Sequence, residues 1–113
     1  MDTGSEQLPL QIVLFDTGMS QKVFKLSMQY EFDSQKSELN NTKHGIDFVS
    51  AQLLWEDPAR VVIPARTSDE PRFLLIGRIS ERYWSAVFTL RGQAIRIISV
   101  RPSRKEEVEI YEG

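Results

Sequence analysis

Three apolar segments in close succession most constrain how this chain folds. They are 71–80 (PRFLLIGRIS), 83–92 (YWSAVFTLRG) and 92–101 (GQAIRIISVR), and each has the composition of a strand. The links between them are too short for the crossover that parallel neighbours need, so the segments predict an antiparallel meander. Residues 59–65 (ARVVIPA) are a weaker fourth strand, because Pro64 suits the edge of a sheet or the end of a strand.

Capping residues mark two helices before these strands. Asp33 or Ser34 can accept hydrogen bonds from the free amides at the start of a helix, and Gly45 can adopt the left-handed conformation that ends it. Residues 46–58 predict a second helix with Asp47 as its N-cap and a proline at its end. Its apolar stripe is formed by Phe48, Ala51, Leu54 and Trp55.

A third helix is predicted after the last strand. It starts at Pro102 and Ser103, with Glu106 at the distance of a capping box from Ser103. Since residues 28–33 also alternate as a strand, the order is strand, two helices, a run of strands and a helix. That order is typical of the α+β class, with helices packed on one face of a small antiparallel sheet.

Residues 1–27 differ in pattern from the rest of the chain. Their apolar run LQIVLF and alternating run QKVFKL either pair as a hairpin or belong to a poorly ordered extension. We expect residues 28–113 to form a single domain with one modest core. The start MDTGSEQLPL lacks the features of a signal peptide, and no apolar run is long enough to span a bilayer. We therefore expect a cytoplasmic protein with no membrane segment.

Charge is distributed unevenly along a chain whose net charge is −2. Between Arg60 and Lys105 there are ten basic and three acidic residues, a net charge of +7, and nine of those ten are arginines. Arginine presents a flat fork of donors that matches a phosphate, so this segment predicts an RNA-binding or phosphate-binding face. The alternative is that these are solvated strand residues that keep sheet edges soluble. Without cysteine and with one histidine, the chain has no thiolate or histidine-rich metal site.

Alternation along the strands assigns the arginines to faces. Arg72 and Arg78 share one face of their strand, and Arg91 lies at the end of the next strand. The same rule predicts that Arg96 and Arg101, five residues apart, lie on opposite faces of the last strand. Arginines at both ends of an apolar strand face are what a cleft beside a core contains, and also what ordinary strand ends contain.

Two interpretations fit Lys43 and His44. At the last turn of a helix, cations interact favourably with the helix dipole, which explains both residues without any function. Alternatively they face the arginine cluster, where one of them moves a proton or holds a phosphate. Histidine is the side chain that most readily exchanges a proton near neutral pH.

Three segments together resemble a known family. KHGIDFVSAQLLWEDP, RFLLIGRIS and IRIISVRPSRKEEVEIYE resemble the BrnT toxins of bacterial type II toxin–antitoxin systems. The resemblance runs from about Met28 to Gly113, and the combination is specific although each segment alone is a weak signal. The chain departs from the family pattern in residues 1–27 and at Phe88, where relatives often carry Tyr or His.

The resemblance implies a RelE-like fold and a ribonuclease that stops translation and growth, with no metal or organic cofactor. The implied partner is BrnA, a ribbon–helix–helix antitoxin that holds the toxin inactive. The complex, with a dimer within it, would reach promoter DNA through the antitoxin. The family-typical positions in this chain are Lys43, His44, Gly45, Arg72, Gly77, Arg78, Arg91, Arg96, Ser99 and Arg101.

These positions lead to a hypothesis of metal-independent RNA cleavage, in which a 2′-hydroxyl attacks the adjacent phosphate. Arg72, Arg78 and Arg96 would stabilise the charge that develops on the phosphate oxygens.

Other residues would complete such a site. Arg91 and Arg101 would hold flanking phosphates, and the base would be Lys43, His44 or Glu70. The alternative function is a non-catalytic module that binds the antitoxin as a co-repressor, in which Lys43 and His44 only end a helix.

Overall fold

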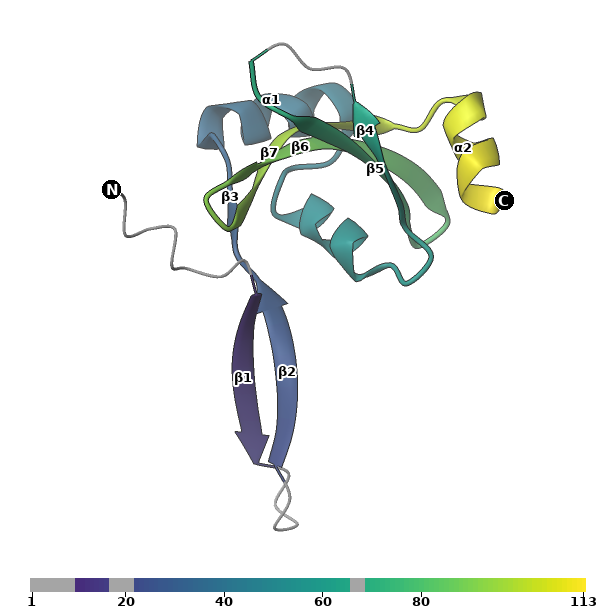
Figure 1. Ribbon diagram of the computed structural model, residues 1–113. Coiled ribbons are helices and arrows are strands. Elements are labelled where there is room, and N and C mark those ends of the chain that lie inside the picture. The colour runs from purple at the N-terminus through teal and green to yellow at the C-terminus, as the bar shows by residue number, and fades with distance from the viewer. Residues whose placement is uncertain (1–9, 17–21, 66–68) are drawn as a thin grey trace.

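The computed structural model describes the backbone of residues 10–16, 22–65 and 69–113, and side chains from residue 28 onward within those ranges. Its elements in chain order are β1 (Leu10–Asp16), β2 (Lys22–Met28), β3 (Tyr30–Glu31), α1 (Ser34–His44), the 3-10 helix η2 (Ser50–Glu56), β4 (Val61–Ala65), β5 (Arg72–Ile79), β6 (Arg82–Arg91), β7 (Ala94–Pro102) and α2 (Lys105–Glu112). They form two separate sheets, as Figure 1 shows.

The smaller sheet is an antiparallel hairpin of β1 and β2, in register from Leu10 opposite Met28 to Asp16 opposite Lys22. The other parts of the predicted extension, residues 1–9 and 17–21, lie outside the described residues. The division of the chain into an extension and a domain at residue 27 stays a prediction.

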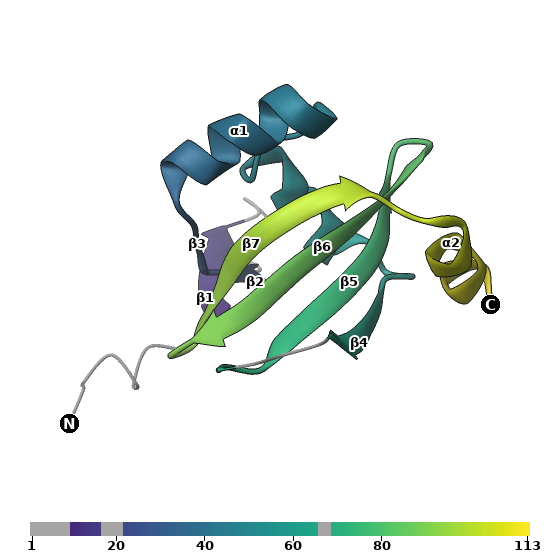
Figure 2. The same cartoon turned by 90° about the horizontal axis from the view of Figure 1, so that it is seen from above.

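The larger sheet has five strands in the order β3-β7-β6-β5-β4. β4 to β7 form the predicted antiparallel meander. β3 pairs parallel to β7, so the sheet is mixed, where the sequence predicted an antiparallel one. The long stretch of chain between β3 and β7 permits this parallel pairing. The α+β class is confirmed, and α1 and η2 pack on one face of the sheet (Figure 2).

Helix α1 begins and ends at the predicted caps. The Asp33 carboxylate accepts hydrogen bonds from the backbone N–H groups of Gln35 and Lys36, at 2.9 and 3.1 Å. Gly45 has a φ of 84°, and its N–H donates to the Asn41 carbonyl at 2.8 Å. Any other residue would be strained in that left-handed conformation.

Polar side chains attach α1 to β7 and to the following loop. The buried Asn40 amide donates to the Ile46 carbonyl at 2.8 Å and accepts from the Val100 N–H at 3.2 Å. The Phe48 N–H donates to the hydroxyl of the buried Ser37 at 2.8 Å. Asn40 thus occupies the edge of β7 beyond the short β3, where a strand would otherwise pair.

The predicted second helix forms as the 3-10 helix η2. Its N-cap is Val49, where the sequence predicted Asp47, although the Asp47 carboxylate accepts a hydrogen bond from the Ser50 N–H at 2.7 Å. The whole predicted stripe is buried against the sheet: Phe48, Ala51, Leu54 and Trp55. η2 approaches β5 closely, since a Cβ added at Gly77 would lie 3.0 Å from Cδ2 of Leu54.

The core lies between the sheet and the two helices α1 and η2. Its strand residues are Leu75, Trp84, Ala86, Phe88, Ile95, Ile97 and Val100. Phe88 stacks on Phe73 and meets the edge of Trp55, with ring centroids 5.4 and 5.3 Å apart. β4 is an edge strand, as the presence of Pro64 predicted.

The C-terminal helix begins later than predicted. α2 has Arg104 as its N-cap, and the Glu107 carboxylate, in place of Glu106, accepts from the Arg104 N–H at 2.8 Å. The Ser103 hydroxyl bonds instead to the Ser85 hydroxyl of β6, at 2.8 Å. No helix of the described residues is long and apolar enough to cross a membrane.

A bulge between β6 and β7 corrects one prediction. The register shifts between Val87 and Phe88, so β7 has one residue more than β6 in this region. Arg96 therefore pairs with Thr89 and Arg101 with Ser85, which lie four residues apart on β6 and project from the same face. The prediction that Arg96 and Arg101 lie on opposite faces was wrong, because simple alternation fails across a bulge.

Candidate functional site

We call the face of the sheet opposite α1 and η2 the open face (Figure 2). The strand register places the candidate arginines on it, and α2 contacts one end of it through Ser85 and Arg101. Arg72 precedes Phe73, whose ring lies in the core, so Arg72 projects from the open face. Thr89 on β6 pairs with Arg96 on β7, which pairs with Glu31 on β3. The Thr89 hydroxyl donates to the Pro71 carbonyl at 2.6 Å. This bond holds the residue just before β5 beside Thr89, which itself pairs with Arg96.

Acidic side chains accompany these arginines. The Glu70 carboxylate lies 3.9 Å from the Arg72 guanidinium and 3.4 Å from that of Arg91. Arg96 donates to the Glu31 carboxylate at 3.0 Å. The structure therefore brings together four predicted site residues: Glu70, Arg72, Arg91 and Arg96. We call these four with Glu31 the arginine row.

Arg101 lies toward the other end of the sheet, against α2. Its guanidinium forms two hydrogen bonds of 2.8 Å with the Glu107 carboxylate, which also accepts from the Ser85 hydroxyl at 2.8 Å. The bonds from Arg101 lower the pKa of Glu107 to about 2, and the same contact raises the pKa of Arg101. This pair ties α2 to the sheet, a role that the sequence did not predict.

Arg78 also lies at the α2 end. Its guanidinium stacks over the Tyr83 ring at 5.2 Å, and the backbone N–H of Arg78 donates to the Asp57 carboxylate at 2.9 Å. The Tyr111 hydroxyl donates to the same carboxylate at 2.9 Å. Burial alone would raise the pKa of Asp57, but hydrogen bonds from Ala59, Tyr111 and Arg78 lower it below its usual value. Arg72 begins β5, and Arg78 lies near the other end of the same strand.

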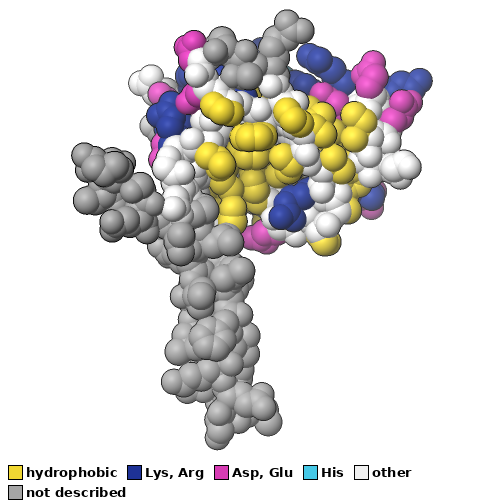
Figure 3. Space-filling model, viewed as in Figure 1, with side chains coloured by type: hydrophobic (Ala, Val, Ile, Leu, Met, Phe, Trp, Pro, Cys, Tyr) yellow, Lys and Arg dark blue, Asp and Glu magenta, His cyan; other side chains and the backbone are white. Residues whose placement is uncertain are grey.

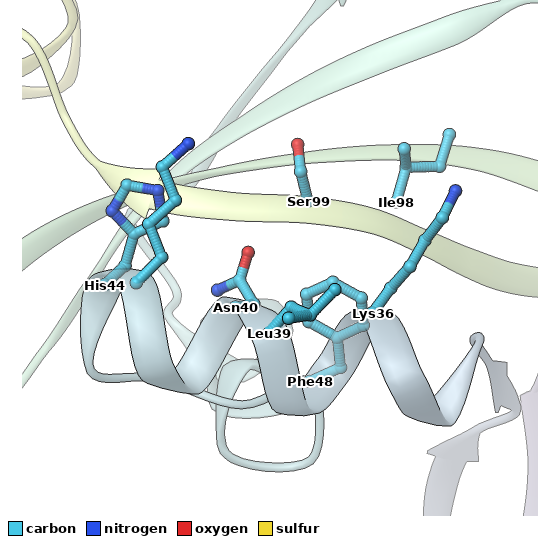
Figure 4. Close-up of a pocket in the computed structure, with 8 residues that line it drawn as sticks. Lys36, Leu39, Asn40, His44, Phe48, Ile98 and Ser99 are labelled. Carbon is cyan, nitrogen blue, oxygen red and sulfur yellow. The ribbon is translucent and has the colours of Figure 1, made fainter.

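Lys43 and His44 line a groove between α1 and β7 (Figure 4). The groove has a volume of about 280 Å³. Its lining comprises Lys36, Leu39, Asn40, Lys43, His44, Phe48, Ile98 and Ser99. In Figure 4 the Asn40 side chain points toward Ser99, and Lys36 extends from α1 beside Ile98. We call this feature the α1–β7 groove.

The cations of the α1–β7 groove differ from the arginines in their pairing. Arg72, Arg91, Arg96 and Arg101 each meet a carboxylate within 4 Å. The basic side chains of the groove are Lys36, Lys43 and His44. None of them forms an ion pair within residues 28–65 and 69–113. Arg66, which belongs to the basic segment, lies outside the described residues. Lys36 and Lys43 thus bring positive charge to the groove that no described carboxylate pairs with.

Ser99 connects the groove to the open face. Ser99 pairs with Val87, two residues from the partner of Arg96 on β6, so Ser99 and Arg96 project from one face. The groove therefore borders the open face along β7. An extended anionic chain could contact Lys36 and Lys43 at that border and Arg96 beyond it.

Sequence reasoning did not identify Lys36 or the α2 contacts. Lys36, Asn40 and Lys43 recur at the spacing of one helix face, which was the available signal for Lys36. The contacts of Asp57 with Tyr111 and of Glu107 with Ser85 had no local signal, since these partners are 54 and 22 residues apart in the chain. The described residues contain no group of three or more His, Asp or Glu side chains that could hold a metal ion.

A comparison with protein-family models identifies residues 32–107 as matching the ribonuclease toxin BrnT of type II toxin–antitoxin systems. The match covers about two thirds of the 113 residues. The chain belongs to the BrnT family. A comparison with curated proteins gave no match.

The BrnT match includes both the α1–β7 groove and the arginine row apart from Glu31. All eight candidate residues of the sequence analysis fall inside it, from Lys43 to Arg101. As a BrnT toxin of a type II system, the protein is a ribonuclease toxin with an antitoxin partner. The hairpin of β1 and β2 lies before the matched residues.

Proposed function

We propose that this BrnT toxin is a metal-independent endoribonuclease that uses the α1–β7 groove and the adjoining arginine row. The observation that carries the proposal is a groove lined by Lys36, Lys43 and His44, which form no ion pair among the described residues, beside an arginine-bearing face. A polyanion gains most where positive charge is not already neutralised. Both features lie in the part of the chain that matches the toxin family, except Glu31.

The proposed reaction is an internal transesterification. The 2′-oxygen forms a bond to the adjacent phosphorus, and the bond from phosphorus to the 5′-oxygen breaks. The products are a 2′,3′-cyclic phosphate and a free 5′-hydroxyl. One proton leaves the 2′-hydroxyl for a base, and one is delivered to the departing 5′-oxygen, so no metal or co-reactant is consumed.

Lys43 and His44 are the proposed bases. They are adjacent at the end of α1, Lys43 is exposed, and His44 is half-buried in the groove wall. Glu70 is the third candidate, and its carboxylate already lies between Arg72 and Arg91. A carboxylate in that position also serves to hold the two guanidiniums until RNA arrives.

Arg72 and Arg96 are the proposed clamp for the developing charge, with Arg91 on a flanking phosphate. Their carboxylate partners are a third or more exposed, and an exposed ion pair contributes only about 0–1 kcal/mol. A phosphate can therefore replace Glu70 or Glu31 at small cost. Arg78 and Arg101 would bind more distant phosphates, and Arg101 also binds Glu107 of α2.

The proposed partner is a BrnA-like ribbon–helix–helix antitoxin in the cytoplasm. It would hold the toxin inactive, and a complex containing a dimer would contact promoter DNA through the antitoxin. The family match supports an antitoxin, and the antitoxin fold follows from the resemblance to BrnT toxins.

The test is cleavage of RNA by the purified full chain in the presence of EDTA. Loss of the base in Lys43→Ala or His44→Ala should slow cleavage about 10²–10⁴-fold. The double variant Arg72→Ala/Arg96→Ala should slow it about 10²-fold or more. Lys105→Ala on α2 removes an exposed cation elsewhere and should leave the rate unchanged. Cleavage by all these variants at the parental rate would refute the proposed site.

A non-catalytic co-repressor is the second candidate, and the arginine pairing favours it. Four of the five candidate arginines already contact carboxylates of this chain, as arginines that only stabilise the fold would. Growth after induced expression separates the two candidates. Arrest that an antitoxin relieves supports the ribonuclease, and a folded product without arrest supports the co-repressor.

A further inference from the structure

The helices α1 and η2 leave part of their face of the sheet uncovered. The exposed Val62, Pro64 and Leu90 and the half-buried Tyr30 and Phe73 lie there, and we call these five residues the apolar patch. Val62 is 46% exposed and Leu90 is 52% exposed. Pro64 pairs with Phe73 across β4 and β5, so the members from neighbouring strands lie side by side. Figure 3 shows a broad hydrophobic surface on this side of the molecule.

Packed aromatic rings form the floor of the apolar patch. Trp55 and Phe88, which are 8% and 6% exposed, lie beneath it. The edge of Trp55 meets Tyr30 at a centroid distance of 5.6 Å, and Phe73 stacks on Phe88 at 5.4 Å. A floor of interlocked rings is already in place before any partner binds, which lowers the entropic cost of association.

The charges beside the apolar patch are mixed. Glu56 and Arg60 both lie close enough to act on the Tyr30 hydroxyl, whose pKa burial raises to about 12. Tyr30 therefore stays a hydrogen-bond donor at neutral pH. Aromatic residues with an arginine and a polar rim are typical of protein–protein interfaces. Nucleic-acid surfaces instead present clustered cations, and here those belong to the α1–β7 groove and the arginine row.

We propose that the apolar patch docks an amphipathic helix of the antitoxin, which places an acidic side chain against Arg60. A type II toxin has a protein antitoxin as its partner, and the patch has the composition for a protein. A helix fits better than an added strand, because Pro64 offers no N–H to a strand pairing with the β4 edge.

This docking rests on the antitoxin partnership proposed above and is independent of the cleavage mechanism. The apolar patch lies on the helix-covered side of the sheet, and the arginine row lies on the open face. The antitoxin would therefore be held by one face while another part of it blocks the RNA site. Binding and cleavage become separable by substitution, which makes the inference testable.

The test uses Val62→Glu and Leu90→Glu, with Ile110→Glu as the matched control. Ile110 on α2 is also 46% exposed, so a glutamate there adds the same charge to an equally accessible apolar position. The probe is the product of the gene adjacent to the toxin gene, titrated by calorimetry into each purified full-length variant. RNA cleavage by each free variant and its oligomeric state are measured in parallel.

We expect the patch variants to bind this probe at least tenfold more weakly than the parent, with cleavage unchanged. Ile110→Glu should bind as the parent does. Equal affinity of all variants, or equal losses at Val62 and Ile110, would overturn the inference. A monomer–dimer shift in Val62→Glu without loss of affinity would assign the patch to a second copy of this chain instead. If the patch variants bind the probe more weakly but the parent protein cleaves no RNA, the docking inference stands and the proposed ribonuclease site is refuted.

Discussion

The contact between Glu107 and Arg101 allows a quantitative test of how α2 is attached. Glu107 is 8% exposed and accepts hydrogen bonds from Arg101, Ser85 and the Arg104 N–H. Glu107→Gln keeps the size of the side chain but removes its charge. One oxygen acceptor is also replaced by a donor that faces the Arg101 guanidinium. The substitution therefore tests the charge pair with little change in packing.

The expected cost follows from the pKa of Glu107. These contacts lower it from 4.5 to about 2, which corresponds to roughly 3 kcal/mol in favour of the ionised form. Arg101 is 26% exposed and can be hydrated when its partner is lost, so we expect Glu107→Gln to reduce the free energy of unfolding by about 2–3 kcal/mol at pH 7.

The sign of the pH dependence is fixed by the direction of the shift. A carboxyl whose pKa is lower in the folded protein stabilises it fully above its unfolded value of 4.5, and this stabilisation is lost as the pH falls toward about 2. The parent should therefore lose stability across that range more steeply than Glu107→Gln. The difference between the two proteins should shrink toward zero near pH 2.

Urea unfolding followed by tryptophan fluorescence measures both effects, because Trp84 lies next to Ser85 on β6. The control is Glu109→Gln, an exposed glutamate on the same helix, which should change stability by less than about 0.5 kcal/mol. A loss below about 0.5 kcal/mol for Glu107→Gln at pH 7 would refute the reasoning. A gap that stays constant down to pH 2 would refute it equally.

Three further substitutions test the fold by the same unfolding assay. Asn40→Ala leaves the Ile46 carbonyl and the Val100 N–H without partners and should cost about 2–3 kcal/mol, while the exposed neighbour in Asn41→Ala should cost much less. Gly77→Ala should cost about 1–3 kcal/mol, since the new Cβ would lie 3.0 Å from Leu54 Cδ2; an unchanged midpoint would mean that Leu54 moves freely. Gly45→Ala should cost about 1 kcal/mol through its positive φ alone, because nothing lies within 4 Å of the added Cβ.

Local features of the sequence predicted much of the fold. Asp33 and Gly45 cap α1 because capping depends on residues within one turn. The apolar stripe of residues 48–55 is buried because its spacing already defines one face of a helix. The meander from β4 to β7 follows from short links between successive strand-forming segments.

The candidate site was less predictable, because its geometry depends on partners far apart in the chain. Arg96 and Glu31 are separated by 65 residues, and their contact requires the parallel pairing of β3 with β7. Because of the bulge beside Val87, Arg101 lies on the face opposite to the one that simple alternation predicts. No local pattern in the sequence of β7 indicated this bulge. Lys43 and His44 were recognised as a helix end, but their position against Ser99 depends on how α1 packs on β7.

The sequence by itself determined the helices and strands, their order and the BrnT resemblance, since each depends on neighbouring residues. Only the tertiary structure decided which charges are neutralised. It pairs Arg101 with Glu107 and the arginine row with Glu31 and Glu70, while leaving the cations of the α1–β7 groove without ion pairs among the described residues. The physical reason is that Coulomb energy depends on the distance between charges in space and on their exposure to water, and both are set by packing.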